Sequence, residues 1–84
     1  MKTQLFQKIE FLLTLLEARL ESDHPAQIAA LLKEMNPIAI SLGGTILEHF
    51  QELKREARRY LKEPKHLPAL KERVLKLRNE FWEL

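Results

Sequence analysis

Residues 5–20 read LFQKIEFLLTLLEARL, and the spacing of their apolar side chains predicts the fold class. Steps of three and four residues, the repeat of one helix face, separate Leu5, Ile9, Leu12, Leu16 and Leu20. The period-two alternation of a β-strand occurs neither here nor elsewhere in the sequence. We therefore predict a helix over residues 2–22.

Three further helical segments are separated by prolines that follow helix-capping residues. The Asp-His-Pro sequence at 23–25 predicts a second helix over 25–35, which we expect to be the shortest. Asn36 before Pro37 repeats the pattern and predicts a third helix over 37–63. After a connection rich in proline, the fourth helix is expected over 68–82. Proline suits these starts because its missing N–H would have no partner in the first turn.

A glycine pair interrupts the third predicted helix. Glycine in a helix interior costs about 1 kcal/mol relative to alanine, so Gly43 and Gly44 favour a kink or a break. The sequence TILE at 45–48, directly after the pair, has the spacing of a capping box, which also favours a new start. Alternatively, the glycines allow another helix to approach closely. The sequence leaves both interpretations open.

The short connections predict that consecutive helices lie antiparallel. We expect an all-α fold, a small up-down bundle of four helices, formed by residues 1–84 as a single domain, because 84 residues cannot supply a second core. With no cysteine, the chain has neither disulfides nor thiolate metal ligands, which favours a reducing compartment. No apolar run approaches a membrane span or a signal-peptide core. We expect a cytoplasmic protein without a membrane partner.

No pattern of catalytic residues accompanies these helices. His24, His49 and His66 lack second ligands at zinc-site spacing, and the hydroxyl residues lack a nucleophile motif. Charges at the edges of apolar faces, such as Lys8 and Arg78, could line an enzyme site between helices, but such side chains usually extend into water. We therefore expect no enzyme, no cofactor, no metal and no small-molecule substrate.

Charge is distributed unevenly along the chain. Residues 1–50 carry four basic and six acidic side chains, whereas residues 51–84 carry ten basic and six acidic ones. Within the second part, an arc of about 140° on the third helix holds Lys54, Arg55, Arg58, Arg59 and Lys62. Glu52, Glu56 and Glu63 lie beside Arg55 and Arg59 and neutralise that edge in part. This basic stripe is either a solvated helix face or a site for phosphates or an acidic partner.

Apolar side chains exceed what one buried stripe per helix requires. Phe11 lies off the main face of the first helix, and the fourth helix adds Leu75, Phe81, Trp82 and Leu84. Exposed apolar patches mark interaction sites, and twofold dimers are the commonest oligomers. These five residues are therefore predicted to form an apolar interface, for a homodimer or a protein partner. The alternative is a closed monomer that buries these additional apolar side chains in its core.

Two functional hypotheses follow. The first is a non-enzymatic protein-interaction module of adaptor, chaperone or regulatory type that self-associates through its apolar helix faces. The second is a nucleic-acid-binding accessory protein that uses the basic stripe of the third helix and binds more weakly as salt is raised.

Overall fold

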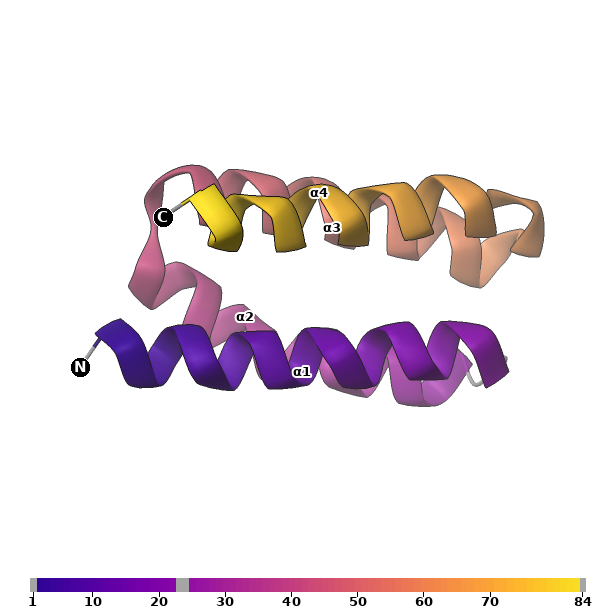
Figure 1. The fold of residues 1–84 in the computed structure, drawn as a ribbon. Coiled ribbons are helices and arrows are strands. Elements are labelled where there is room, and N and C mark those ends of the chain that lie inside the picture. Colours follow the sequence, from indigo (N-terminus) through magenta and orange to yellow (C-terminus); the bar gives the residue numbers. More distant parts are fainter. Residues whose placement is uncertain (1, 23–24, 84) are drawn as a thin grey trace.

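Four helices pack against one another in an up-down bundle (Figure 1), so the predicted all-α fold class is confirmed. The computed structural model describes the backbone of residues 2–22 and 25–83, and the side chains of residues 4–21 and 25–80. The helices are α1 (Lys2–Ser22), α2 (Pro25–Leu42), α3 (Gly44–Lys62) and α4 (Leu67–Glu83), with a short 3-10 turn, η1 (Pro64–His66), before α4.

The core is formed by one apolar stripe from each helix. In α1 the buried side chains are those of the helical repeat from Ile9 to Leu20, with Leu13 added, and Leu5 is partly buried. The largest side chains that are fully buried are Phe50, Ile9, Leu13, Leu16, Ile28, Met35, Leu53, Leu70 and Leu77. All four helices contribute to this set, so no helix is peripheral to the bundle.

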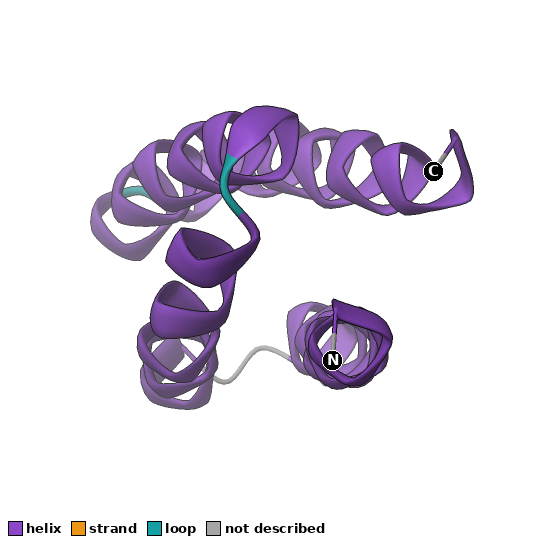
Figure 2. Ribbon diagram, turned by 90° about the vertical axis from the view of Figure 1, so that its left-hand side faces the viewer, coloured by secondary structure: helices purple, strands orange, loops and turns teal. Residues whose placement is uncertain are grey.

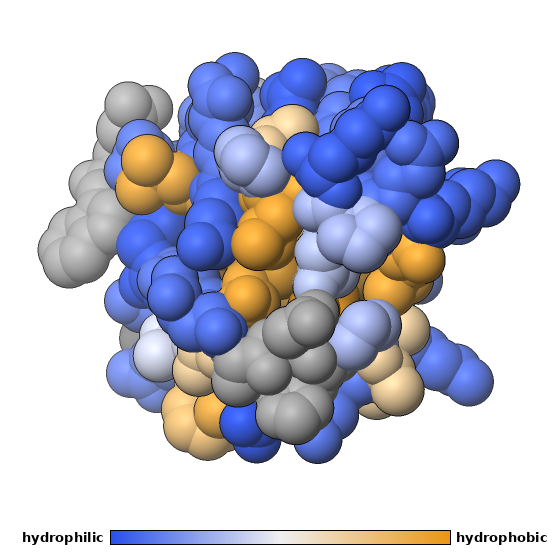
Figure 3. Space-filling model, turned by 90° about the vertical axis from the view of Figure 1, so that its right-hand side faces the viewer, coloured by the Kyte–Doolittle hydropathy of each residue, from blue (hydrophilic) through white to orange (hydrophobic). Residues whose placement is uncertain are grey.

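The bundle consists of two helical hairpins. Seen along the bundle, α1 and α2 form one layer and α3 and α4 form the other (Figure 2). This view also shows that α2 and α3 lie on one side of the molecule, with α1 and α4 on the other. At one end of the bundle, a strip of hydrophobic surface is visible among hydrophilic side chains (Figure 3). One groove lies between the layers on each of the two sides, α2 with α3 and α1 with α4.

The predicted boundary between the second and third helices is wrong. α2 does not end near Met35 but continues through Pro37 to Leu42, and at 18 residues it is not the shortest helix, since α4 has 17. The apolar stripe of α2 continues past the proline with Ile38 and Ala39, both buried. Their burial offsets the backbone hydrogen bond that proline removes. Asn36 therefore caps no helix.

Pro37 redirects the end of α2. In Figure 1 the last part of α2 rises from the level of α1 towards α3, as expected for a helix bent at an internal proline. Ser41 Oγ donates a hydrogen bond of 3.0 Å to the carbonyl oxygen of Pro37, one turn earlier, an interaction that often accompanies a bend in a helix. The bend brings the end of α2 to the start of α3.

Gly43 alone connects α2 to α3, so the predicted break is confirmed. Its N–H donates to the Ala39 oxygen at 2.9 Å, and its own oxygen accepts from the Leu47 N–H at 3.2 Å. Both glycines have positive φ, +65° at Gly43 and +56° at Gly44. Added Cβ atoms would meet nothing closer than 4.0 Å. The glycines therefore serve the backbone turn, not the close approach of another helix.

The predicted capping box at residues 45–48 is also wrong. α3 begins at Gly44, so Thr45 lies inside its first turn, and no side chain caps this helix. At the other end of α3, the Glu63 N–H donates to the Arg59 oxygen at 2.8 Å. Pro64 then begins η1, which leads directly into α4 one residue before Pro68.

Candidate partner-binding groove

The structure divides the predicted basic stripe of α3 between two sides. Arg55 pairs with Glu52 at 2.9 Å and Arg59 pairs with Glu56 at 3.0 Å, as their spacing predicts. Lys54 and Arg58 lie at the other edge of the arc and line a groove between α3 and α2. Lys62 is exposed at the end of α3. The stripe therefore has one edge that is paired with glutamates and one edge that lines a groove.

A groove of about 320 Å³ lies between α2 and α3, which form one side of the bundle in Figure 2. It combines an apolar floor with cationic side chains from both helices. Its lining residues are Ala29, Leu32, Lys33, Asn36, Lys54, Ala57, Arg58 and Leu61. We refer to it as the α2–α3 groove. Lys33 is the contribution that the sequence did not indicate, because its proximity to Lys54 and Arg58 depends on how the two helices pack.

Lys54 is held in place at the groove by two contacts. Its Nζ donates a hydrogen bond of 2.8 Å to Asn36 Oδ1, which links α3 to α2. The same Nζ lies 5.6 Å from the centroid of the Phe50 ring, within the range of a cation–π interaction. Both partners are uncharged, so the positive charge of Lys54 is positioned without being neutralised.

The remaining cations of the groove also lack a neutralising partner. Among the described residues, Lys33 and Arg58 form no ion pair with a carboxylate, and both side chains are exposed. Together with Lys54, they give the α2–α3 groove three positive charges. A site of this kind attracts an anionic ligand, because like charges near an apolar surface raise the local potential.

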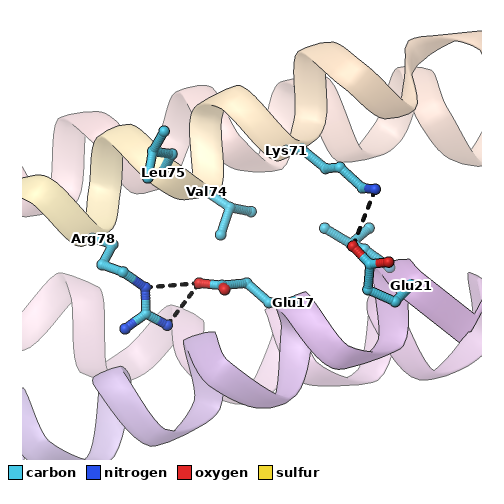
Figure 4. Close-up of a pocket in the computed structure, with 7 residues that line it drawn as sticks. Glu17, Glu21, Lys71, Val74, Leu75 and Arg78 are labelled. Carbon is cyan, nitrogen blue, oxygen red and sulfur yellow. Dashed lines mark hydrogen bonds and ion pairs between the residues drawn. The ribbon is translucent and has the colours of Figure 1, made fainter.

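The opposite side of the bundle behaves differently. Here a groove of about 260 Å³ lies between α1 and α4 (Figure 4), and its charges neutralise one another. Arg78 Nε donates to Glu17 Oε1 at 2.7 Å, and Lys71 Nζ lies 3.2 Å from Glu21 Oε1. Arg78 also donates to Thr14 Oγ1 at 3.1 Å. Arg78 thus joins α4 to α1, and this groove holds no excess charge.

The predicted apolar interface is described only in part. Phe11 and Leu75 are exposed, at 63% and 56%, as the sequence analysis expects. Leu75 lines the groove between α1 and α4, whereas Phe11 does not. The side chains of Phe81 and Trp82, and Leu84 as a whole, lie outside the described residues. Of the predicted interface, the described part of the chain therefore shows two exposed apolar side chains, one on α1 and one on α4.

The histidines give no sign of a metal centre in the described residues. His49 Nε2 lies 3.2 Å from Glu80 Oε1 and joins α3 to α4, and His66 is half-buried in η1. Within residues 2–22 and 25–83, no three potential ligands among His, Cys, Asp and Glu cluster together. Across the same residues, no helix has the length and apolarity needed to cross a membrane. His24 lies outside the described residues.

Comparison with protein-family models, with curated proteins and with solved structures finds no match to this chain.

Proposed function

We propose that this chain is a non-enzymatic protein-interaction module that holds an acidic segment of a partner protein in the α2–α3 groove. One observation carries the proposal. Lys33, Lys54 and Arg58 come from two helices to one groove, and none of them pairs with a carboxylate in the described structure. By contrast, the neighbouring Arg55 and Arg59 of α3 each pair with a glutamate.

The apolar floor favours a protein partner over a nucleic acid. Ala29 and Leu61 present exposed aliphatic surface beside the cations, and the buried Leu32 and Ala57 complete the lining. Nucleic acids gain affinity from phosphate contacts and from stacking on exposed aromatic rings, and no described aromatic side chain lines this groove. An acidic protein segment with apolar side chains matches both the charge and the floor.

Reversing Lys33 and Arg58 to glutamate is expected to abolish binding of an acidic polypeptide. Poly-L-glutamate serves as the probe, and NMR chemical shifts of backbone amides report its site. In the unaltered chain, shifts are expected at residues 33, 54, 57 and 58, and to fade as salt is raised. Among the described residues, neither Lys33 nor Arg58 forms an ion pair. The Lys33→Glu/Arg58→Glu variant is therefore expected to keep the ion pairs of the fold and to lose only its binding of poly-L-glutamate.

A matched control separates local charge from net charge. Lys8→Glu/Lys76→Glu changes the net charge equally but lies on α1 and α4, so poly-L-glutamate binding is expected to fall less than twofold. Equal loss in both double variants would overturn the proposal. A 20-base-pair DNA duplex is titrated in parallel. If the duplex binds more tightly than poly-L-glutamate at the same residues, the partner is a nucleic acid and the proposed protein partner is wrong.

A second candidate function is self-association, which the exposure of Phe11 and Leu75 favours. Analytical ultracentrifugation is expected to show a sedimentation coefficient that rises with concentration, and Phe11→Ser/Leu75→Ser is expected to remove this dependence. Ile40→Ser provides the control, because Ile40 is similarly exposed, at 59%, on α2. A chain that sediments as a monomer at every concentration contradicts self-association and leaves the groove proposal intact.

A further inference from the structure

We infer that the occupant of the α2–α3 groove is an acidic amphipathic α-helix of the partner protein. This inference rests on the function proposed above and specifies the conformation and sequence pattern of the ligand. Three features of the groove support it: the apolar side chains of the floor, the small residues from both helices, and the positions of the cations.

The floor favours a ligand that satisfies its own backbone. Ala29 and Leu61 expose only apolar side chains, and Leu32 and Ala57 are buried. Apart from the Lys33 carbonyl, which Pro37 leaves without an N–H donor, the backbone groups of both helices are used within the helices. An extended peptide placed there would leave N–H and C=O groups without partners, at a cost in free energy. A helix forms these hydrogen bonds internally. Helix-in-groove recognition is therefore compatible with the site, whereas addition of an extended strand is not.

Small residues make room for an apolar anchor. Ala29 on α2 and Ala57 on α3 are the small residues of the floor, one from each helix, where larger side chains would fill the groove. Leu61 is 41% exposed beside them. A leucine-sized side chain from the partner would cover the exposed part of Leu61 and contact Ala29. The partner helix is thus expected to present one apolar stripe towards the floor.

The cations define where acidic residues belong on that helix. Lys54 and Arg58 are four residues apart, so they follow one another by about 6 Å along α3. Carboxylates at positions i and i+4 of a helix have the same separation. Lys33, on the opposite wall, matches a further carboxylate across the apolar stripe. The pattern that fits is therefore an apolar stripe with acidic residues along both of its edges.

Two synthetic peptides of 15 residues test this inference. Both have the same amino-acid composition, made only of glutamate, leucine, alanine and glutamine, and both have capped ends. The first has leucine at helical spacing with glutamate along both edges, and the second has the same residues in an order without helical periodicity. Isothermal titration calorimetry measures affinity, and circular dichroism measures helix content on binding. The patterned peptide is expected to bind at least tenfold more tightly and to gain helicity.

A third peptide places proline at the centre of the pattern, which prevents a continuous helix without changing the charge. It is expected to bind as weakly as the unpatterned peptide. If all three bind equally and displace poly-L-glutamate, the helical ligand is wrong and the proposed function stands. If neither these peptides nor poly-L-glutamate bind, both are wrong.

Filling the groove gives an independent test on the protein. Ala29→Leu adds an apolar side chain to an exposed position on the floor and leaves the charge unchanged. It is expected to lower the affinity for the patterned peptide at least fivefold and the affinity for poly-L-glutamate less than twofold. Ala30→Leu is the matched control, because Ala30 is also exposed on α2 but faces a different groove. Equal affinity of the patterned peptide for Ala29→Leu and the unaltered chain would overturn the inference.

Discussion

Replacing Phe50 with alanine is expected to lower the free energy of unfolding by about 3–5 kcal/mol. Phe50 is fully buried in α3 and is the largest side chain in that state. Its truncation removes apolar contacts and leaves a cavity that the four surrounding helices cannot close completely. For 84 residues the total stability is on the order of 4–13 kcal/mol, at about 0.05–0.15 kcal/mol per residue. This one change therefore removes a large share of it.

Urea denaturation followed by circular dichroism measures the effect, and Phe11→Ala is the control. Phe11 is 63% exposed, so the same substitution there is expected to change the free energy of unfolding by less than about 0.5 kcal/mol at low protein concentration. Equal effects at both positions would contradict the core described here. Phe50→Ala also removes the ring beneath Lys54. The affinity of the folded variant for poly-L-glutamate is therefore expected to change as well.

Substituting both glycines of the α2–α3 connection is expected to destabilise the bent chain and to favour a dimer. Gly43, at φ +65° and ψ −161°, occupies a region that is essentially restricted to glycine. Alanine at both positions is expected to cost about 2–5 kcal/mol in total, through backbone strain alone, because added Cβ atoms meet nothing within contact distance. A helical backbone at 43 and 44 relieves the strain by joining α2 and α3 into one long helix, and two such chains can exchange hairpins.

Size-exclusion chromatography with light scattering measures this outcome, as a concentration-dependent dimer of Gly43→Ala/Gly44→Ala. A chemically synthesised chain with D-alanine at position 43 is the control, because D-residues favour positive φ. That chain is expected to stay monomeric under the same conditions and to keep its stability. Should the double variant be as stable as the unaltered chain, the backbone described for Gly43 is wrong.

The helical architecture is predictable from the sequence because periodicity reports burial directly. Four of the five residues that define the repeat of α1 are buried, and the fifth, Leu5, is partly buried. The error at Asn36 and Pro37 has a physical cause: local rules for helix starts apply to both, but burial of Ile38 and Ala39 favours continuing the helix. At Gly43 the sequence indicated an interruption, but not that one residue suffices to turn the chain.

The candidate site was predictable only in part. The spacing of Arg55 and Arg59 from acidic neighbours is local, so their ion pairs follow from the sequence. The groove depends on which sides of α2 and α3 meet, and no local pattern encodes that. Lys33 was missed for this reason, since it becomes part of a cationic site only through a neighbour more than twenty residues away in the chain.

The hydrogen bond between Lys54 and Asn36 gives the α2–α3 groove a direction. It bridges the two walls at the end nearer Gly43, where the bend at Pro37 also brings α2 up to α3 (Figure 1). Ala29 and Leu61 lie at the other end, about 10 Å along the helices at 1.5 Å per residue. The groove is thus about two helical turns long, with its walls joined at one end and free of such a link at the other. The two ends of a bound helix therefore meet different surroundings, a hydrogen-bonded pair at one end and the exposed Ala29 and Leu61 at the other.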